Sequence, residues 1–139
     1  MKSLVTILLC LCFVRVLHAD IVVVVSVGSA VLPMNEQQVS NIFLSKSNRF
    51  SNGEKAIPLE VRNSQLRAEF YKLISNKTTT QLKSYWTTLI FTGKGKPPKS
   101  FSDKQELLEY MKSHRGSIAY VLLSEVTPEM KVIYQVSAE

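Results

Sequence analysis

A chain of 139 residues, 45% hydrophobic and 20% charged, suits one domain with a substantial core. Its formal net charge of +6 is a mild basic excess. This excess excludes the dense basic stripe of a nucleic-acid-binding protein, and it fits either an anionic ligand or an ordinary lysine-rich surface.

The first 19 residues have the three-part layout of a secretory signal peptide. Lys2 precedes a mostly apolar run that ends near Val14, and Ala19 offers a cleavage site. The run is shorter than the roughly 20 residues that span a bilayer, so no retained membrane span is expected and an anchor is the less favoured alternative. We therefore predict a signal peptide over residues 1–19 and a single periplasmic or otherwise secreted domain over residues 20–139.

Loss of this leader changes the chemistry available to the chain. Both cysteines, Cys10 and Cys12, would be removed, so no disulfide is predicted, and the net charge would fall to +4. Without a cysteine, Cys–His catalysis is excluded. The only histidine left would be His114, and its place near a predicted helix end disfavours a Ser–His–Asp triad. The acidic residues are scattered. We predict no metal site, no cofactor and no enzymatic activity, a small hydrolase being the least favoured function.

The first predicted strand is a run of β-branched residues over Ile21–Val25. Continuous apolar residues indicate burial on both faces, as in a parallel sheet covered by helices, and we predict that this strand is central. A small-residue loop over Ser26–Ala30 follows its carboxyl end, which is where open α/β sheets bind ligands.

The rest of the chain alternates between helices and strands. Helices with apolar stripes are predicted to start at Asn35 (with Gln38 in a capping box and an end near Leu44), at Ser64, after Thr78–Thr80 (with Ile90 in the stripe and Gly93 as the stop) and at Ser102–Asp103. Strands are predicted over 56–61, 118–123 and 131–136, with Pro58 indicating an edge or a strand start. This pattern predicts an α/β fold, a layered sheet with helices on both faces.

The start of the second predicted helix is a candidate oxyanion site. The Ser64 hydroxyl, the free N–H groups of the first turn and the Arg67 guanidinium favour an anion there. Ser29 and the N–H of Ala30 are expected to approach from the neighbouring strand end. The predicted site comprises Ser29, Ala30, Asn63, Ser64, Gln65 and Arg67. The alternative is that Ser64 only caps its helix while Arg67 lies in solvent.

An ordered set of short motifs resembles the phosphate ABC transporter substrate-binding proteins, especially their short, single-lobe exported relatives. The motifs are Val39–Lys46, Phe50–Gly53, Ser64–Tyr71, Tyr85–Trp86, Phe91–Pro98 and Gly116–Tyr120. The resemblance implies one lobe of a type II periplasmic binding protein, with inorganic phosphate or a related oxyanion as its ligand for uptake or sensing.

A single lobe leaves such an anion exposed to water, which weakens each charged contact. The resemblance therefore implies weak binding, or completion of the site by a second subunit or a membrane transporter. The alternative is a periplasmic interaction module that kept the fold, lost the ligand and uses its surface for a partner protein.

Overall fold

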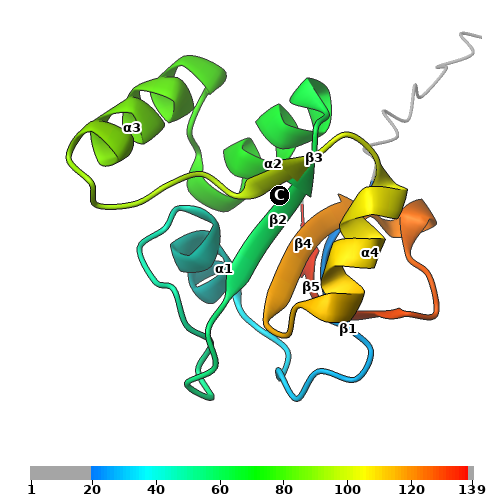
Figure 1. Ribbon diagram of the computed structural model, residues 1–139. Coiled ribbons are helices and arrows are strands. Elements are labelled where there is room, and N and C mark those ends of the chain that lie inside the picture. The colour runs from blue at the N-terminus through cyan, green and yellow to red at the C-terminus, as the bar shows by residue number, and fades with distance from the viewer. Residues whose placement is uncertain (1–19, 138–139) are drawn as a thin grey trace, which may run out of the picture.

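The computed structural model describes residues 20–137 as one mixed sheet with helices on both faces (Figure 1). The predicted signal peptide, residues 1–19, lies outside the described residues. In chain order the elements are β1 (Ile21–Ser26), α1 (Glu36–Phe43), β2 (Ile57–Val61), α2 (Ser64–Ser75), α3 (Thr79–Phe91), β3 (Lys99–Phe101), α4 (Lys104–Ser113), β4 (Ser117–Leu122), the 3₁₀ turn η1 (Leu123–Glu125) and β5 (Met130–Val136). Within this described part of the chain, no helix combines the length and the apolar character needed to cross a bilayer.

The five strands lie in the order β3-β2-β4-β1-β5. β2 pairs in parallel with β3 and β4, whereas β1 pairs antiparallel with both β4 and β5. The prediction of β1 as the central strand of a parallel sheet is therefore wrong, because β4 holds the centre and β1 runs against it. The valine run indicates burial on both faces, and that property is shared by buried antiparallel strands.

Alternating residues of β1 build two separate cores. Ile21, Val23 and Val25 belong to the core under α1, α2 and α3, and Val22 and Val24 belong to the core under α4. The α/β class and the placement of helices on both faces are thus confirmed. The five strands of this sheet and the two cores are all built from residues between Ile21 and Val136, so a chain that starts at Asp20 contains all of them.

Aromatic side chains hold α2 against the sheet. The ring of Phe70 stacks on that of Tyr120 on β4, with centroids 3.9 Å apart and an interplanar angle of 11°. Phe43 of α1 meets Phe70 edge-on at 5.0 Å, and its backbone carbonyl accepts a hydrogen bond of 3.0 Å from the Tyr71 hydroxyl. These contacts fix where the first turn of α2 lies relative to the strand ends.

Helix boundaries follow the predicted caps at two places. Asn35 and Gln38 form the expected capping box, each side chain accepting a 2.9 Å bond from the other's backbone N–H. α3 ends at a Schellman motif, in which Gly93 has φ +67° and the Lys94 N–H donates to the carbonyl of Leu89. Both predicted signals are therefore confirmed.

Ile90 does not belong to the buried stripe of α3. Its side chain is 57% exposed, whereas Leu82 and Trp86 of the same helix are buried. α3 buries only a narrow face, and Ile90 lies beyond the edge of that face.

β2 is an interior strand, so the prediction of an edge at Pro58 is wrong while that of a strand start is right. Pro58 pairs only with Ile118 of β4, because pairing with β3 begins one residue later at Leu59. The missing N–H of proline is tolerated at such a position. The short strand that covers β2, Lys99–Phe101, had not been predicted.

Candidate functional site

The carboxyl ends of the three parallel strands β2, β3 and β4 meet at one end of the sheet. Val61 pairs with Phe101, and the next backbone N–H, that of Arg62, donates to the Phe101 carbonyl at 2.8 Å. α2 begins directly after β2, at Ser64. We call this region the α2 end. Open α/β sheets bind their ligands just outside the carboxyl ends of their strands, as at this end of the sheet.

The first turn of α2 is capped by Asn63. The Asn63 carboxamide oxygen accepts a 3.0 Å bond from the Leu66 N–H, and Ser64 is the first helical residue. The alternative that Ser64 caps the helix is therefore wrong by one position. The backbone bonding of this first turn starts with the Arg67 N–H, which donates to the Asn63 carbonyl at 3.0 Å. The N–H groups of Ser64 and Gln65 precede that bond and face the end of the helix.

Replacing Asn63 with alanine should lower the free energy of unfolding by about 1 kcal/mol, since the cap on the Leu66 N–H is lost. Ser64→Ala should change it by less than about 0.5 kcal/mol, because an exposed serine without a capping role is removed. Urea unfolding of both variants checks this. Equal losses would contradict the assignment of the cap.

Arg67 is held at the α2 end by a buried carboxylate. Its Nε lies 3.8 Å from an oxygen of Glu60, and its guanidinium lies 5.9 Å from the ring centroid of Tyr71. The side chain keeps 37% of its surface exposed. The alternative that Arg67 lies only in solvent is thus wrong, and the charge has a defined place beside the first turn.

Glu60 is the residue that sequence reasoning missed. It is 3% exposed on β2 and accepts hydrogen bonds from the Tyr120 hydroxyl at 2.6 Å and the Ser100 hydroxyl at 2.9 Å. Burial, and then the negative charge of Glu60, raise the pKa of Tyr120 far above its ordinary value. Tyr120 therefore stays protonated and keeps donating to Glu60 at neutral pH. The one signal in the sequence was a carboxylate between Leu59 and Val61 in a predicted strand.

Ser29 and Ala30 lie at the opposite end of the sheet. β1 runs antiparallel to β4, which runs parallel to β2, so the carboxyl end of β1 lies beside the amino ends of the other two strands. The six residues of β1 place these ends about 17 Å apart. The expected approach of Ser29 and Ala30 to Ser64 is therefore wrong, because it assumed a parallel first strand.

The loop after β1 uses its polar groups locally. The Ser29 N–H donates to the Ser26 carbonyl at 2.9 Å, and the Ser29 hydroxyl accepts from the Val31 N–H at 3.2 Å. The Lys131 ammonium donates to the Ser29 carbonyl. The structure thus brings Asn63, Ser64, Gln65 and Arg67 together and leaves the loop after β1 apart, as a closed turn.

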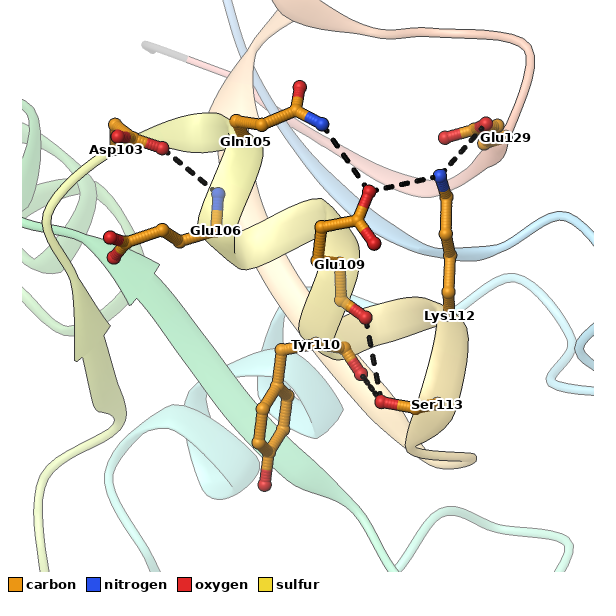
Figure 2. A network of polar contacts seen from close by, with 8 residues as sticks. All are labelled: Asp103, Gln105, Glu106, Glu109, Tyr110, Lys112, Ser113 and Glu129. Atoms are coloured by element: carbon orange, nitrogen blue, oxygen red, sulfur yellow. Dashed lines mark hydrogen bonds and ion pairs between the residues drawn. The ribbon is translucent and has the colours of Figure 1, made fainter.

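The carboxylates of α4 form surface pairs and caps, as Figure 2 shows. Glu109 contacts the Lys112 ammonium at 3.3 Å, and Lys112 also lies 3.5 Å from Glu129. Asp103 accepts the N–H of Glu106 at 2.9 Å as the helix cap. All these side chains are exposed, whereas a pair of carboxylates that acts as general acid and base needs one buried member. Over residues 20–137, no three His, Cys, Asp or Glu side chains gather as metal ligands.

Comparison with known proteins gives likeness of fold alone. No protein-family model matches the chain, and no curated protein sequence does. Among solved structures, the chain is similar to an ABC-type phosphate transport receptor from Vibrio cholerae, with 12% identity and a TM-score of 0.59. It is equally similar, at 11% identity and a TM-score of 0.59, to a putative phosphate ABC transporter substrate-binding protein with bound phosphate from Clostridium perfringens. A possible phosphate-binding protein from Planctomyces limnophilus has 14% identity and the same TM-score.

These likenesses cover 83% of this chain but only 46%, 45% and 41% of the three solved chains. The chain thus spans less than half the length of the structures that it matches. The described fold is therefore similar to one part of each of these three solved structures.

Proposed function

We propose that this chain is an exported, non-enzymatic solute-binding domain that binds phosphate or a related oxyanion at the α2 end, for uptake or sensing. The observation that carries the proposal is the first turn of α2. Its N-terminus opens at the carboxyl ends of parallel strands, with the Ser64 hydroxyl, two N–H groups and the Arg67 guanidinium beside it. Anions are favoured at such a helix start. One solved structure of similar fold, the putative phosphate ABC transporter substrate-binding protein from Clostridium perfringens, holds bound phosphate.

The binding is expected to be weak. Ser64 and Gln65 are exposed, so water screens each contact with the anion. The negative charge of Glu60 also lies within 3.8 Å of Arg67 and offsets part of its attraction for an anion. A second subunit or a membrane transporter that covers the α2 end would exclude water and strengthen binding, which is the partner we propose for the domain.

Calorimetric titration of residues 20–139 with phosphate, sulfate and citrate tests the site. We expect millimolar phosphate binding that weakens about tenfold in Arg67→Ala, because a charged contact is lost. Ser64→Ala should weaken phosphate binding about threefold. Because Asn63 and not Ser64 caps the helix, this variant should leave the stability of the fold nearly unchanged. Arg115→Ala is the matched control, since Arg115 is exposed and precedes β4 at the opposite end of the sheet.

Two results would sink the site at the α2 end. One is the absence of heat at millimolar phosphate in a folded sample, and the other is undiminished binding in Arg67→Ala. Either result would favour the alternative, an interaction module that kept the fold and lost the ligand. The pairing of Arg67 with a buried carboxylate favours that alternative, because Glu60 repels an anion from the same place.

A further inference from the structure

α3 carries an apolar tip that the fold does not cover. Figure 1 shows α3 standing away from the sheet, beyond α2. It is attached through Trp86, which meets the ring of Tyr71 edge-on, and through the Tyr85 hydroxyl, which donates to the Leu44 carbonyl at 2.6 Å. Past these contacts, Phe91 is 91% exposed and Ile90 is 57% exposed. We define the α3 tip as Ile90, Phe91, Lys94 and Lys96.

The stretch of chain that carries the α3 tip has charged residues of one sign. From residue 70 to residue 102 the chain has no Asp, Glu or Arg, and its charged residues are Lys72, Lys77, Lys83, Lys94, Lys96 and Lys99. All but Lys77 are exposed. About a quarter of the chain therefore presents lysine charge without an acidic residue of its own. Such a surface attracts anionic partners.

The loop that carries Lys94 and Lys96 is held in place. The Schellman motif bonds the Lys94 N–H to the Leu89 carbonyl at 3.0 Å, so the loop turns sharply after Phe91. Gly95 packs so closely on Ser45 that an added Cβ would lie 2.7 Å from its hydroxyl oxygen. The apolar and basic groups of the α3 tip are thus presented together on a fixed turn, with little entropy to lose on binding.

We infer that the α3 tip binds an anionic lipid surface. Phe91 and Ile90 enter the headgroup layer while Lys94 and Lys96 contact lipid phosphates, the combination that keeps proteins at membrane interfaces. The cations of the α3 tip are lysines, and this favours a lipid surface over a protein as its partner. Protein interfaces are depleted in lysine and enriched in arginine, whereas an anionic bilayer attracts either charge by about 1 kcal/mol each.

The α3 tip shares no residue with the proposed oxyanion site. No residue of the α3 tip belongs to the first turn of α2, and Arg67 contacts Glu60 on β2. An Arg67→Ala variant should therefore bind free phosphate more weakly, as above, and bind lipid vesicles unchanged. The same variant tells a lipid phosphate bound by the α3 tip from free phosphate bound at the α2 end.

Sedimentation with lipid vesicles tests the inference on residues 20–139. We expect binding to vesicles of mixed phosphatidylglycerol and phosphatidylcholine at about 0.1 M salt, loss of binding as salt rises, and no binding to phosphatidylcholine alone. Lys94→Gln/Lys96→Gln should weaken binding about 30-fold, since each charge accounts for about fivefold. Lys55→Gln/Arg115→Gln removes the same charge from exposed residues near the amino ends of β2 and β4, and should weaken it less than about threefold.

The apolar contribution has its own pair of variants. Phe91→Ala should weaken vesicle binding about tenfold, whereas Leu32→Ala, at a residue 72% exposed on another loop, should leave it unchanged. Neither site is buried, so both variants should fold. Equal losses from tip and control variants, or equal binding to neutral vesicles, would overturn the inference. Binding to soluble polyglutamate as tight as to vesicles, with no effect of Phe91→Ala, would also overturn it and indicate an acidic protein partner.

Discussion

Replacing Gly116 with alanine should lower the free energy of unfolding by about 3–5 kcal/mol. Gly116 has φ +84°, and an added Cβ would lie well inside van der Waals contact with the backbone carbonyl of Lys55. The Gly116 carbonyl accepts a 2.8 Å bond from the Ile57 N–H. The two segments therefore cannot separate without loosening the start of the pairing between β2 and β4.

Gly53 provides a matched control for this prediction. Its φ of +87° is nearly the same, but nothing lies within 4 Å of an added Cβ. Gly53→Ala should therefore lower the free energy of unfolding by only about 1 kcal/mol, the cost of holding alanine at a positive φ. Urea unfolding of the two variants separates backbone conformation from close approach. Similar losses in both would show that Lys55 moves away freely, and would contradict the tight contact.

Replacing Tyr120 with phenylalanine should cost about 2–3 kcal/mol at neutral pH, because buried Glu60 loses a 2.6 Å hydrogen bond to its carboxylate. The ring stacked on Phe70 is kept, so the loss reports the hydroxyl. Tyr110→Phe is the control, since Tyr110 is only partly buried, and it should change stability by less than about 0.5 kcal/mol. Urea unfolding at pH 7 measures both.

The same variant should change how stability depends on pH. Burial and the Glu60 charge raise the pKa of Tyr120 above its ordinary value of 10.0, so folding favours the protonated hydroxyl. The stability that this provides is complete below pH 10.0 and is lost as the pH rises further. Tyr120→Phe should therefore show a shallower alkaline loss than the unmodified chain. The remaining loss is shared by the other groups whose pKa is raised, which are Tyr71, Tyr85, Tyr134 and Lys112. An unchanged alkaline slope would contradict the role of Tyr120.

The predicted elements match the structure wherever local pattern determines them. The strands and helices expected from apolar stripes, and the caps at Asn35 and Gly93, are present. Strand direction had no such signal, because buried valines look alike in parallel and antiparallel sheets. β3, at Lys99–Phe101, is too short to show alternation and follows two prolines. Its existence depends on the neighbouring strand β2.

The helix start at the candidate site could be predicted from the sequence, but the cap residue, the role of Glu60 and the position of Ser29 could not. Asn63 and Ser64 are equally good caps, and only the extended backbone at Asn63, with φ −142° and ψ 105°, decides between them. The two hydrogen-bond donors to Glu60 are 40 and 60 residues away in sequence, so nothing local indicates its burial. Ser29 was placed wrongly because its position depended on the direction of a strand.

The pairing of β1 sets the order in which this protein can fold. The two strands that pair with β1 are the last two strands of the chain to be synthesised: Ile21 lies opposite Leu122 of β4 on one side and Val136 of β5 on the other. Contacts that join residues roughly 100 positions apart form slowly. The run Ile21–Val25, strongly β-forming and uncharged, must therefore wait unpaired while most of the chain is synthesised, and such segments are prone to aggregate. β1 contributes to both cores, and until β4 and β5 are synthesised it is the segment whose binding by a chaperone would most reduce aggregation.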